Sequence, residues 1–149
     1  MRQFPLIVIA MAMSLVAMAQ DSPVRWSFAS NKISADKYEL HLQARVEAPW
    51  HIFSQLTPHG GPQPTVITLT KNSVIKAKAG AKELGKKIYR HAPEFGVDVQ
   101  YFDGDVDFIY VVKLKQNVKT IAKSTVEFMV WNEAQCLPAS KVHFAIELN

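Results

Sequence analysis

A period-two alternation of apolar and polar residues runs through much of the chain and limits the kind of structure it can form. Every second side chain is apolar over residues 38–47, 106–115 and 142–148. A segment of this kind forms a strand with one face in a core and the other face in water. The sequence therefore predicts antiparallel sheet, with these inward-facing residues: Tyr38, Leu40, Leu42, Ala44 and Val46; Val106, Phe108, Tyr110, Val112 and Leu114; and Val142, Phe144, Ile146 and Leu148.

Shorter apolar segments and turn sequences complete the pattern. Asp103-Gly104 stands between two apolar segments, which predicts a tight hairpin. The nearest helical pattern covers residues 79–87, but Gly80 and Gly85 argue against a helix there. About eight short strands predict an all-β fold, an immunoglobulin-like antiparallel β-sandwich. The shorter strands are expected over residues 24–29, 65–70, 74–79, 97–102 and 126–131.

The amino-terminal segment has the three parts of a secretory signal peptide. Arg2 supplies a positive start, residues 4–16 are almost wholly apolar, and Ala17-Met18-Ala19 places small residues at a cleavage site. The apolar part is shorter than the ~20 residues of a membrane-spanning helix, which disfavours an uncleaved anchor. We predict a signal peptide over residues 1–19, one mature domain over residues 20–149, and a periplasmic or otherwise extracytoplasmic location without stable membrane insertion.

Charge and composition narrow the function classes. The chain has 149 residues, 48% of them hydrophobic, which is enough for one buried core. The net charge of +4 is modest, but seven basic residues lie within residues 71–90 with only Glu83 against them. Such a run suits an anionic ligand, and equally a solvated edge strand whose lysines discourage pairing. No nucleic-acid partner is predicted.

The sequence offers no metal or cofactor site. The five histidines have no paired spacing, and one cysteine cannot supply a structural zinc site. Neither a phosphate-binding glycine loop nor a nucleophile elbow is present. We therefore expect no metal and no cofactor.

The most specific motif surrounds the single cysteine, Cys136. A strand over residues 126–131 leads into the polar loop Asn132-Glu133-Ala134-Gln135 and then Cys136-Leu137-Pro138. This segment resembles the amino-terminal periplasmic domain of the thiol:disulfide interchange protein DsbD, especially its stand-alone relatives. Three further motifs of the chain are similar to that family: Val24-Arg25-Trp26-Ser27-Phe28, Trp50-His51-Ile52-Phe53-Ser54-Gln55 followed by Gly60-Gly61-Pro62, and Glu94-Phe95-Gly96.

The resemblance covers nearly the whole mature chain and implies both a fold and a function. The family fold is an immunoglobulin-like sandwich. Its cysteine pair, shielded by a cap-loop phenylalanine, relays electrons from a membrane-embedded donor to exported thiol-disulfide proteins. Carried over to this chain, Cys136 is the candidate catalytic residue. Phe95, with Glu94 and Gly96 beside it, is the candidate cap loop, although an ordinary loop aromatic would also suit Phe95.

Trp131 marks a departure from the family, because it stands where the family has its first cysteine. A relay domain cycles between a dithiol and an internal disulfide, and its second sulfur resolves each mixed disulfide. An indole ring cannot do this, so the two-cysteine cycle is excluded and enzyme activity is left open. The resemblance also implies that Trp131 lies beside Cys136.

Three interpretations of Cys136 stay open. It is a nucleophile whose mixed disulfides another protein resolves, a relic packed under Trp131 as a small apolar side chain, or the link in an intermolecular disulfide between two copies. Reactivity needs the thiolate, and the negative charge of Glu133 nearby would raise the thiol pKa.

Trp131 itself has two interpretations. Strand parity directs it outward together with Met129, which would make both residues a partner-binding surface. A break in parity at the strand end would instead fold Trp131 over the loop. The leading expectation is a module that recognises redox partners. The alternative is a non-catalytic immunoglobulin-like binding module that uses Trp131, Met129 and the Phe95 loop.

Overall fold

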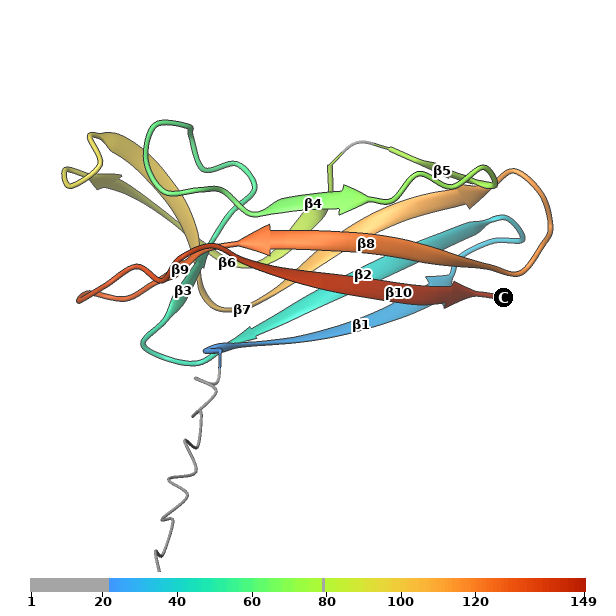
Figure 1. Cartoon of the computed structure of the whole chain (residues 1–149), viewed down its shortest axis with the longest axis horizontal. Coiled ribbons are helices and arrows are strands. Elements are labelled where there is room, and N and C mark those ends of the chain that lie inside the picture. The colour runs from blue at the N-terminus through green and yellow to red at the C-terminus, as the bar shows by residue number, and fades with distance from the viewer. Residues whose placement is uncertain (1–21, 79) are drawn as a thin grey trace, which may run out of the picture.

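The computed structural model describes residues 22–78 and 80–149 as two antiparallel sheets packed against each other (Figure 1). The predicted signal peptide over residues 1–19 lies outside the described residues. None of the described residues is helical, and so none belongs to a helix that could cross a membrane. The strands are β1 (Val24–Lys32), β2 (Lys37–Val46), β3 (His51–Phe53), β4 (Val66–Leu69), β5 (Ile75–Ala77), β6 (Lys82–Ala92), β7 (Val97–Leu114), β8 (Thr120–Phe128), β9 (Val130–Trp131) and β10 (Ser140–Leu148).

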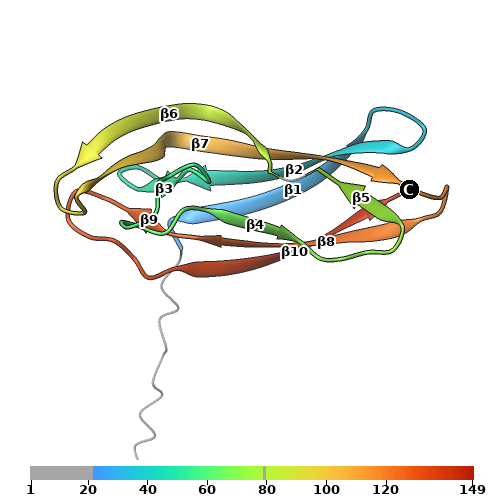
Figure 2. The same ribbon diagram turned by 90° about the horizontal axis from the view of Figure 1, so that it is seen from above.

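The larger sheet has the order β1-β2-β7-β3-β9, and β5 and β6 pair with the other edge of β7. The smaller sheet has the order β10-β8-β4. Figure 2 shows the smaller sheet as a separate layer beside the larger one. This arrangement confirms the predicted all-β sandwich.

The main core fills the space between the two sheets. The alternating residues of β2, β7 and β10 face this core, and all but Val142, which is partly buried, are buried as predicted. Trp26 packs there against the rings of Phe128 and Phe144, with ring centroids 5.2 and 5.8 Å away. The alternation of apolar and polar residues gives each strand one apolar face, and these faces form the core because each is turned toward the opposite sheet.

The predicted hairpin at Asp103-Gly104 is wrong, because β7 continues through both residues. Gly104 takes a φ of +92°, which a glycine adopts without steric cost. The register of β6 against β7 shifts between Gly85 and Lys87 at the same level. The glycine therefore serves a bulge, which bends β7 as its neighbour changes from β2 to β3.

β6 is a strand that the alternation did not predict. It pairs with β7 along most of its length and, in the described part of the chain, with no other strand. The exposed Lys82 and Lys86 of the basic run lie on this edge strand. Their position agrees with the edge-strand interpretation of these two lysines.

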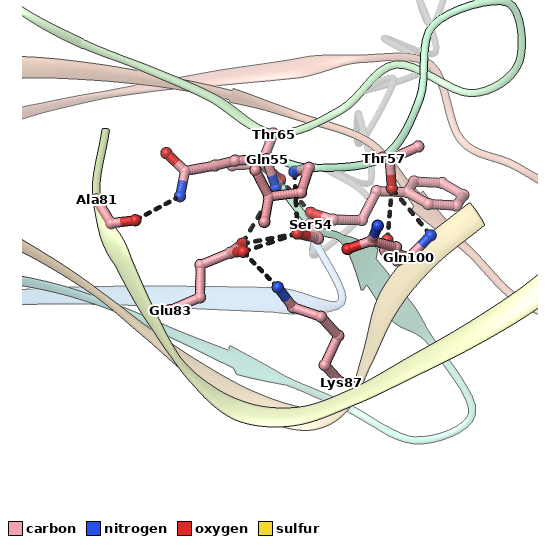
Figure 3. Close-up of polar contacts among 10 residues, drawn as sticks. Ser54, Gln55, Thr57, Thr65, Ala81, Glu83, Lys87 and Gln100 are labelled. Carbon is pink, nitrogen blue, oxygen red and sulfur yellow. Dashed lines mark hydrogen bonds and ion pairs between the residues drawn. The ribbon is translucent and has the colours of Figure 1, made fainter. Parts of the chain in front are cut away.

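A buried carboxylate fastens the segment after β3 to β6 (Figure 3). Glu83 Oε1 accepts hydrogen bonds from Ser54 Oγ at 2.7 Å and from Lys87 Nζ at 2.8 Å. Its Oε2 accepts a hydrogen bond from the Gln55 backbone N–H at 3.1 Å. Gln55 Nε2 donates in turn to the Ala81 carbonyl at 3.2 Å. The network fixes the start of the loop that follows β3.

Candidate functional site

A second, smaller core lies on the opposite face of the β3–β7 pair from the main core. Ile52 and Phe102 belong to the main core, whereas their chain neighbours Phe53 and Tyr101 belong to the smaller one. This division follows from alternation, since adjacent residues of a strand point to opposite faces. The buried members of the smaller core are Phe53, Ala92, Val99, Tyr101 and Trp131.

Trp131 is buried in this smaller core, with 7% of its surface exposed. Strand parity is kept here, since Val126, Phe128 and Val130 belong to the main core whereas Met129 and Trp131 lie on the opposite face. That face is not open to water at this end of the sheet, because residues of β3, β6 and β7 cover it with the smaller core. The expectation that an outward orientation exposes Trp131 is therefore wrong.

The indole ring of Trp131 is surrounded by three aromatic rings and one cation. The ring of Tyr101 meets it edge-on at 5.0 Å, Phe53 stacks at 6.1 Å, and His51 lies at 5.2 Å. The Arg90 guanidinium lies 4.9 Å from the ring centroid. These contacts hold the Trp131 ring on the outer face of the larger sheet and combine burial with a cation–π interaction.

Cys136 pairs with Trp131 in an isolated antiparallel bridge, as the resemblance implied. The loop between them is closed by Asn132, whose Oδ1 accepts hydrogen bonds from the backbone N–H groups of Ala134 and Gln135, both at 2.9 Å. Cys136 is exposed, so the interpretation as a relic packed out of water is wrong. The neck of this loop presents one sulfur on the surface beside one buried indole.

The surroundings of the Cys136 thiol disfavour its charged form. Partial desolvation and the nearby carboxylate of Glu94 raise the pKa of Cys136. The sequence pointed to Glu133 for this effect, but the fold brings in Glu94 from the β6–β7 turn. The Arg90 guanidinium lies 2.7 Å from Glu94 Oε1 and links this carboxylate to the Trp131 ring.

The candidate cap loop is a tight turn between β6 and β7. The backbone N–H groups of Phe95 and Gly96 donate to the Ala92 carbonyl at 3.0 and 2.9 Å. Gly96 has a φ of +68°, which a residue with a side chain rarely adopts. Phe95 is 38% exposed and packs against Gly61, where an added Cβ would lie 3.1 Å from the Phe95 Cβ.

Met129 is only partly buried, and its Sδ accepts a hydrogen bond from the Gln63 backbone N–H at 3.4 Å. The loop over residues 60–63 thus contacts both Phe95 and Met129. Of the candidate residues, the fold brings Trp131, Cys136 and Glu94 together. It places Phe95 and Met129 against the loop over residues 60–63.

Sequence reasoning missed the role of Arg90, which it counted only as part of a basic run. It also gave no partner to His51, whose ring lies 5.2 Å from the ring of Trp131. The alternation within the Trp50–Ser54 motif could have predicted this contact, because it places His51 and Phe53 on the same face of the strand. The described residues contain no group of three or more His, Cys, Asp or Glu side chains arranged to hold a metal ion.

Together, the fold and this site define an immunoglobulin-like β-sandwich with one exposed sulfur at the neck of a loop. The sequence matches no protein-family model and no curated protein. Several solved structures share the fold. The reduced amino-terminal domain of DsbD from Neisseria meningitidis has a TM-score of 0.55 and 12% identity, over 85% of this chain and 86% of that chain.

Two further structures are similar to a comparable degree. The amino-terminal periplasmic domain of ScsB from Proteus mirabilis has a TM-score of 0.56 and 12% identity, over 89% of this chain and 49% of that chain. A complex between the DsbD and PilB amino-terminal domains from Neisseria meningitidis has a TM-score of 0.52 and 10% identity, over 82% of this chain and 80% of that chain. This similarity establishes the fold of DsbD amino-terminal domains for this chain.

Proposed function

We propose that this chain is an exported module of thiol-disulfide interchange that recognises redox partner proteins and uses Cys136 as its single reactive sulfur. Its location would be periplasmic or otherwise extracytoplasmic. The observation that carries the proposal is the pairing of exposed Cys136 with Trp131 on a DsbD-like scaffold. The partners would be exported thiol-disulfide proteins or a membrane-embedded electron donor. A DsbD amino-terminal domain in complex with a PilB domain supports this class of partner.

One sulfur can carry out only half of a thiol-disulfide exchange cycle, the formation of a mixed disulfide, and another protein must resolve it. The Cys136 thiolate attacks one sulfur of a partner disulfide, forms a mixed disulfide with it, and releases the second partner sulfur as a thiolate. A thiol on the partner or on another protein then attacks the mixed disulfide and returns Cys136 to its thiolate. Trp131 cannot take part in this exchange. It supports the loop that presents Cys136.

The proposal is tested by trapping mixed disulfides from a cell-envelope extract with the purified protein, resolving them without reductant, and identifying the captured chains. The matched control is Cys136→Ser, which keeps the size of the side chain. We expect the wild type to capture thiol-disulfide proteins and the variant to capture none covalently. Equal covalent capture by both proteins would refute the proposal.

The same experiment examines the intermolecular disulfide between two copies of the chain. A band at twice the monomer mass that disappears with reductant and in Cys136→Ser would identify this dimer. If it is the sole covalent product in the presence of the extract, Cys136 joins copies of this chain and does not act on partners.

The raised pKa of Cys136 favours a second candidate, a non-catalytic binding module of the cell envelope. Its contact surface would centre on the exposed Phe95 and Glu94 of the cap loop, with Met129 beside it. Trp131 would then act indirectly, by holding the site together. In this case Phe95→Ala weakens partner binding while Cys136→Ser leaves it unchanged. The redox proposal predicts the opposite, namely that Cys136→Ser weakens partner binding more than Phe95→Ala does.

A further inference from the structure

Three lysines stand in one row across three neighbouring strands of the larger sheet. Lys113 of β7 lies directly opposite Lys37 of β2 on one side and directly opposite Lys76 of β5 on the other. Like charges in directly opposed positions of a sheet are destabilising, and lysine is depleted in strands. The row therefore needs an explanation beyond the stability of the fold.

Protection of a sheet edge does not explain this row. That explanation requires lysines on edge strands. Lys113 lies on β7, which has β2 on one edge and β5 and β6 on the other, and Lys37 lies on β2 between β1 and β7. Two of the three lysines thus stand inside the sheet.

The row lines a hollow on the outer face of the larger sheet. This hollow has a volume of about 360 Å³ and is formed by Lys37, Lys76, Ala77, Lys78, Val111 and Lys113. An adjoining hollow shares Lys76 and Lys113 and adds Lys115, Leu114 and Asp36. The residues of both hollows come from β5, the end of β7 and the start of β2 with the turn before it. β5 and the end of β7 lie at the opposite end of the molecule from β9 (Figure 1).

Carboxylates neutralise little of this positive charge. Asp36 Oδ2 lies 3.4 Å from Lys113 Nζ, and the side chains of both residues are about half exposed. Among residues 22–78 and 80–149, neither Lys37 nor Lys76 has a carboxylate within ion-pair distance. Five ammonium groups therefore line the two hollows with a single carboxylate among them, which raises the local concentration of anions.

We propose that this lysine hollow binds a ligand that carries two or more linked phosphate groups. Lysine binds phosphate as a point charge, and each phosphate can satisfy more than one ammonium group. The row extends over two interstrand spacings, roughly 10 Å, which a chain of linked phosphates can follow and one phosphate cannot. The partly exposed Val111 adds an apolar wall for the part of the ligand that carries the phosphates.

The test measures binding of inorganic tripolyphosphate to the purified protein by calorimetry at low salt, with orthophosphate as the comparison. The test variant is the double substitution Lys37→Gln and Lys76→Gln, which leaves the pair of Asp36 and Lys113 in place. The matched control is the double substitution Lys123→Gln and Lys141→Gln, two exposed lysines of the smaller sheet. Thermal unfolding of all three proteins verifies that they fold.

We expect the wild type to bind tripolyphosphate at least tenfold more tightly than orthophosphate. The Lys37 and Lys76 variant should lose at least tenfold in affinity, while the control stays within about twofold. Vesicles with 20% of an anionic phospholipid whose headgroup region carries two linked phosphates form a second arm of the experiment. Binding to vesicles but not to tripolyphosphate, lost in the same variant, would support the proposal and make a lipid headgroup the source of the phosphates.

Two results would overturn the proposal. One is the absence of binding to both tripolyphosphate and vesicles. The other is an equal loss of affinity in the test variant and in the control, because this would show attraction to net charge and not to the lysine row.

Discussion

Trp131 and Cys136 face each other as an antiparallel pair across the neck of a loop, with the indole buried and the sulfur exposed. Directly opposed residues of antiparallel strands have Cα atoms about 4.5–5.5 Å apart. This spacing lies within the range of about 4.4–6.8 Å that a disulfide requires. The backbone at this site is therefore suited to a disulfide, although the sequence supplies only one of its two sulfurs.

The substitution Trp131→Cys should for this reason allow an internal disulfide with Cys136. Titration of free thiols after mild oxidation should give about none for this variant and about one for the wild type. Trp131→Ser is the control, because it removes the same ring and adds no sulfur, and it should keep one free thiol. Two stable free thiols in oxidised, folded Trp131→Cys would contradict the geometry described here.

A second prediction concerns the reactivity of the Cys136 thiol. Desolvation is the larger cause of the raised pKa of Cys136 and the Glu94 carboxylate is the second, so the neutral side chain of Glu94→Gln should lower that pKa and increase the thiolate fraction at neutral pH. The rate of reaction with a small disulfide reagent should rise about two- to fivefold. Glu133→Gln is the control from within the loop and should change the rate little. A larger effect from Glu133 than from Glu94 would refute the assignment.

A third prediction concerns the buried carboxylate of Glu83. In Glu83→Ala, the Ser54 hydroxyl, the Gln55 backbone N–H and the Lys87 ammonium all lose their acceptor. We expect the free energy of unfolding to fall by about 3–5 kcal/mol, measured by denaturant titration. The exposed Glu147 of β10 offers the comparison, since Glu147→Ala should change stability by less than about 0.5 kcal/mol. Similar losses in both variants would contradict a structural role for the network.

A fourth prediction concerns the pH dependence of stability. His41 Nδ1 lies 2.7 Å from Asp107 Oδ2, and its Nε2 lies 3.4 Å from Glu39 Oε2. The hydrogen bond to Asp107 is the main cause of the raised pKa of His41. A raised folded-state pKa contributes stability that is complete below the unfolded value of about 6.5 and is lost as the pH rises through the folded value.

The free energy of unfolding should thus decline as the pH rises above about 6.5, and His41→Gln should remove most of this decline. His143→Gln is the control, since the exposed His143 contacts Thr125 of the smaller sheet through Nδ1 and has no carboxylate partner among the described residues. An unchanged pH profile in His41→Gln would show that another group titrates.

Local alternation was sufficient to predict the sandwich, because β2, β7 and β10 each turn one regular apolar face to the core. The same reasoning failed at Asp103-Gly104. A turn sequence such as Asp-Gly indicates only that the backbone can adopt a positive φ. In this protein Gly104 uses that φ to form a bulge within β7 and not a hairpin turn. It also failed for β6, whose buried positions include Glu83 and whose lysines hide the strand pattern.

The candidate site was predictable only in part. The juxtaposition of Trp131 and Cys136 followed from a family motif. Parity correctly directs Trp131 away from the main core, but it does not encode the second core that covers Trp131 on that face, which is built from Phe53 of β3 and from β6 and β7. Arg90 reaches the site from β6 and Glu94 from the β6–β7 turn, both far away in the sequence.

The central claim is that one accessible sulfur, supported by a buried indole, is what this site offers to other proteins. The most direct measurement is the labelling of Cys136 by a thiol reagent in the native protein, followed by mass spectrometry, with the unfolded protein as the reference. We predict a single label on the native protein within the time needed to label the unfolded chain, slowed only by the raised pKa. Labelling that begins only after unfolding by denaturant would contradict the claim.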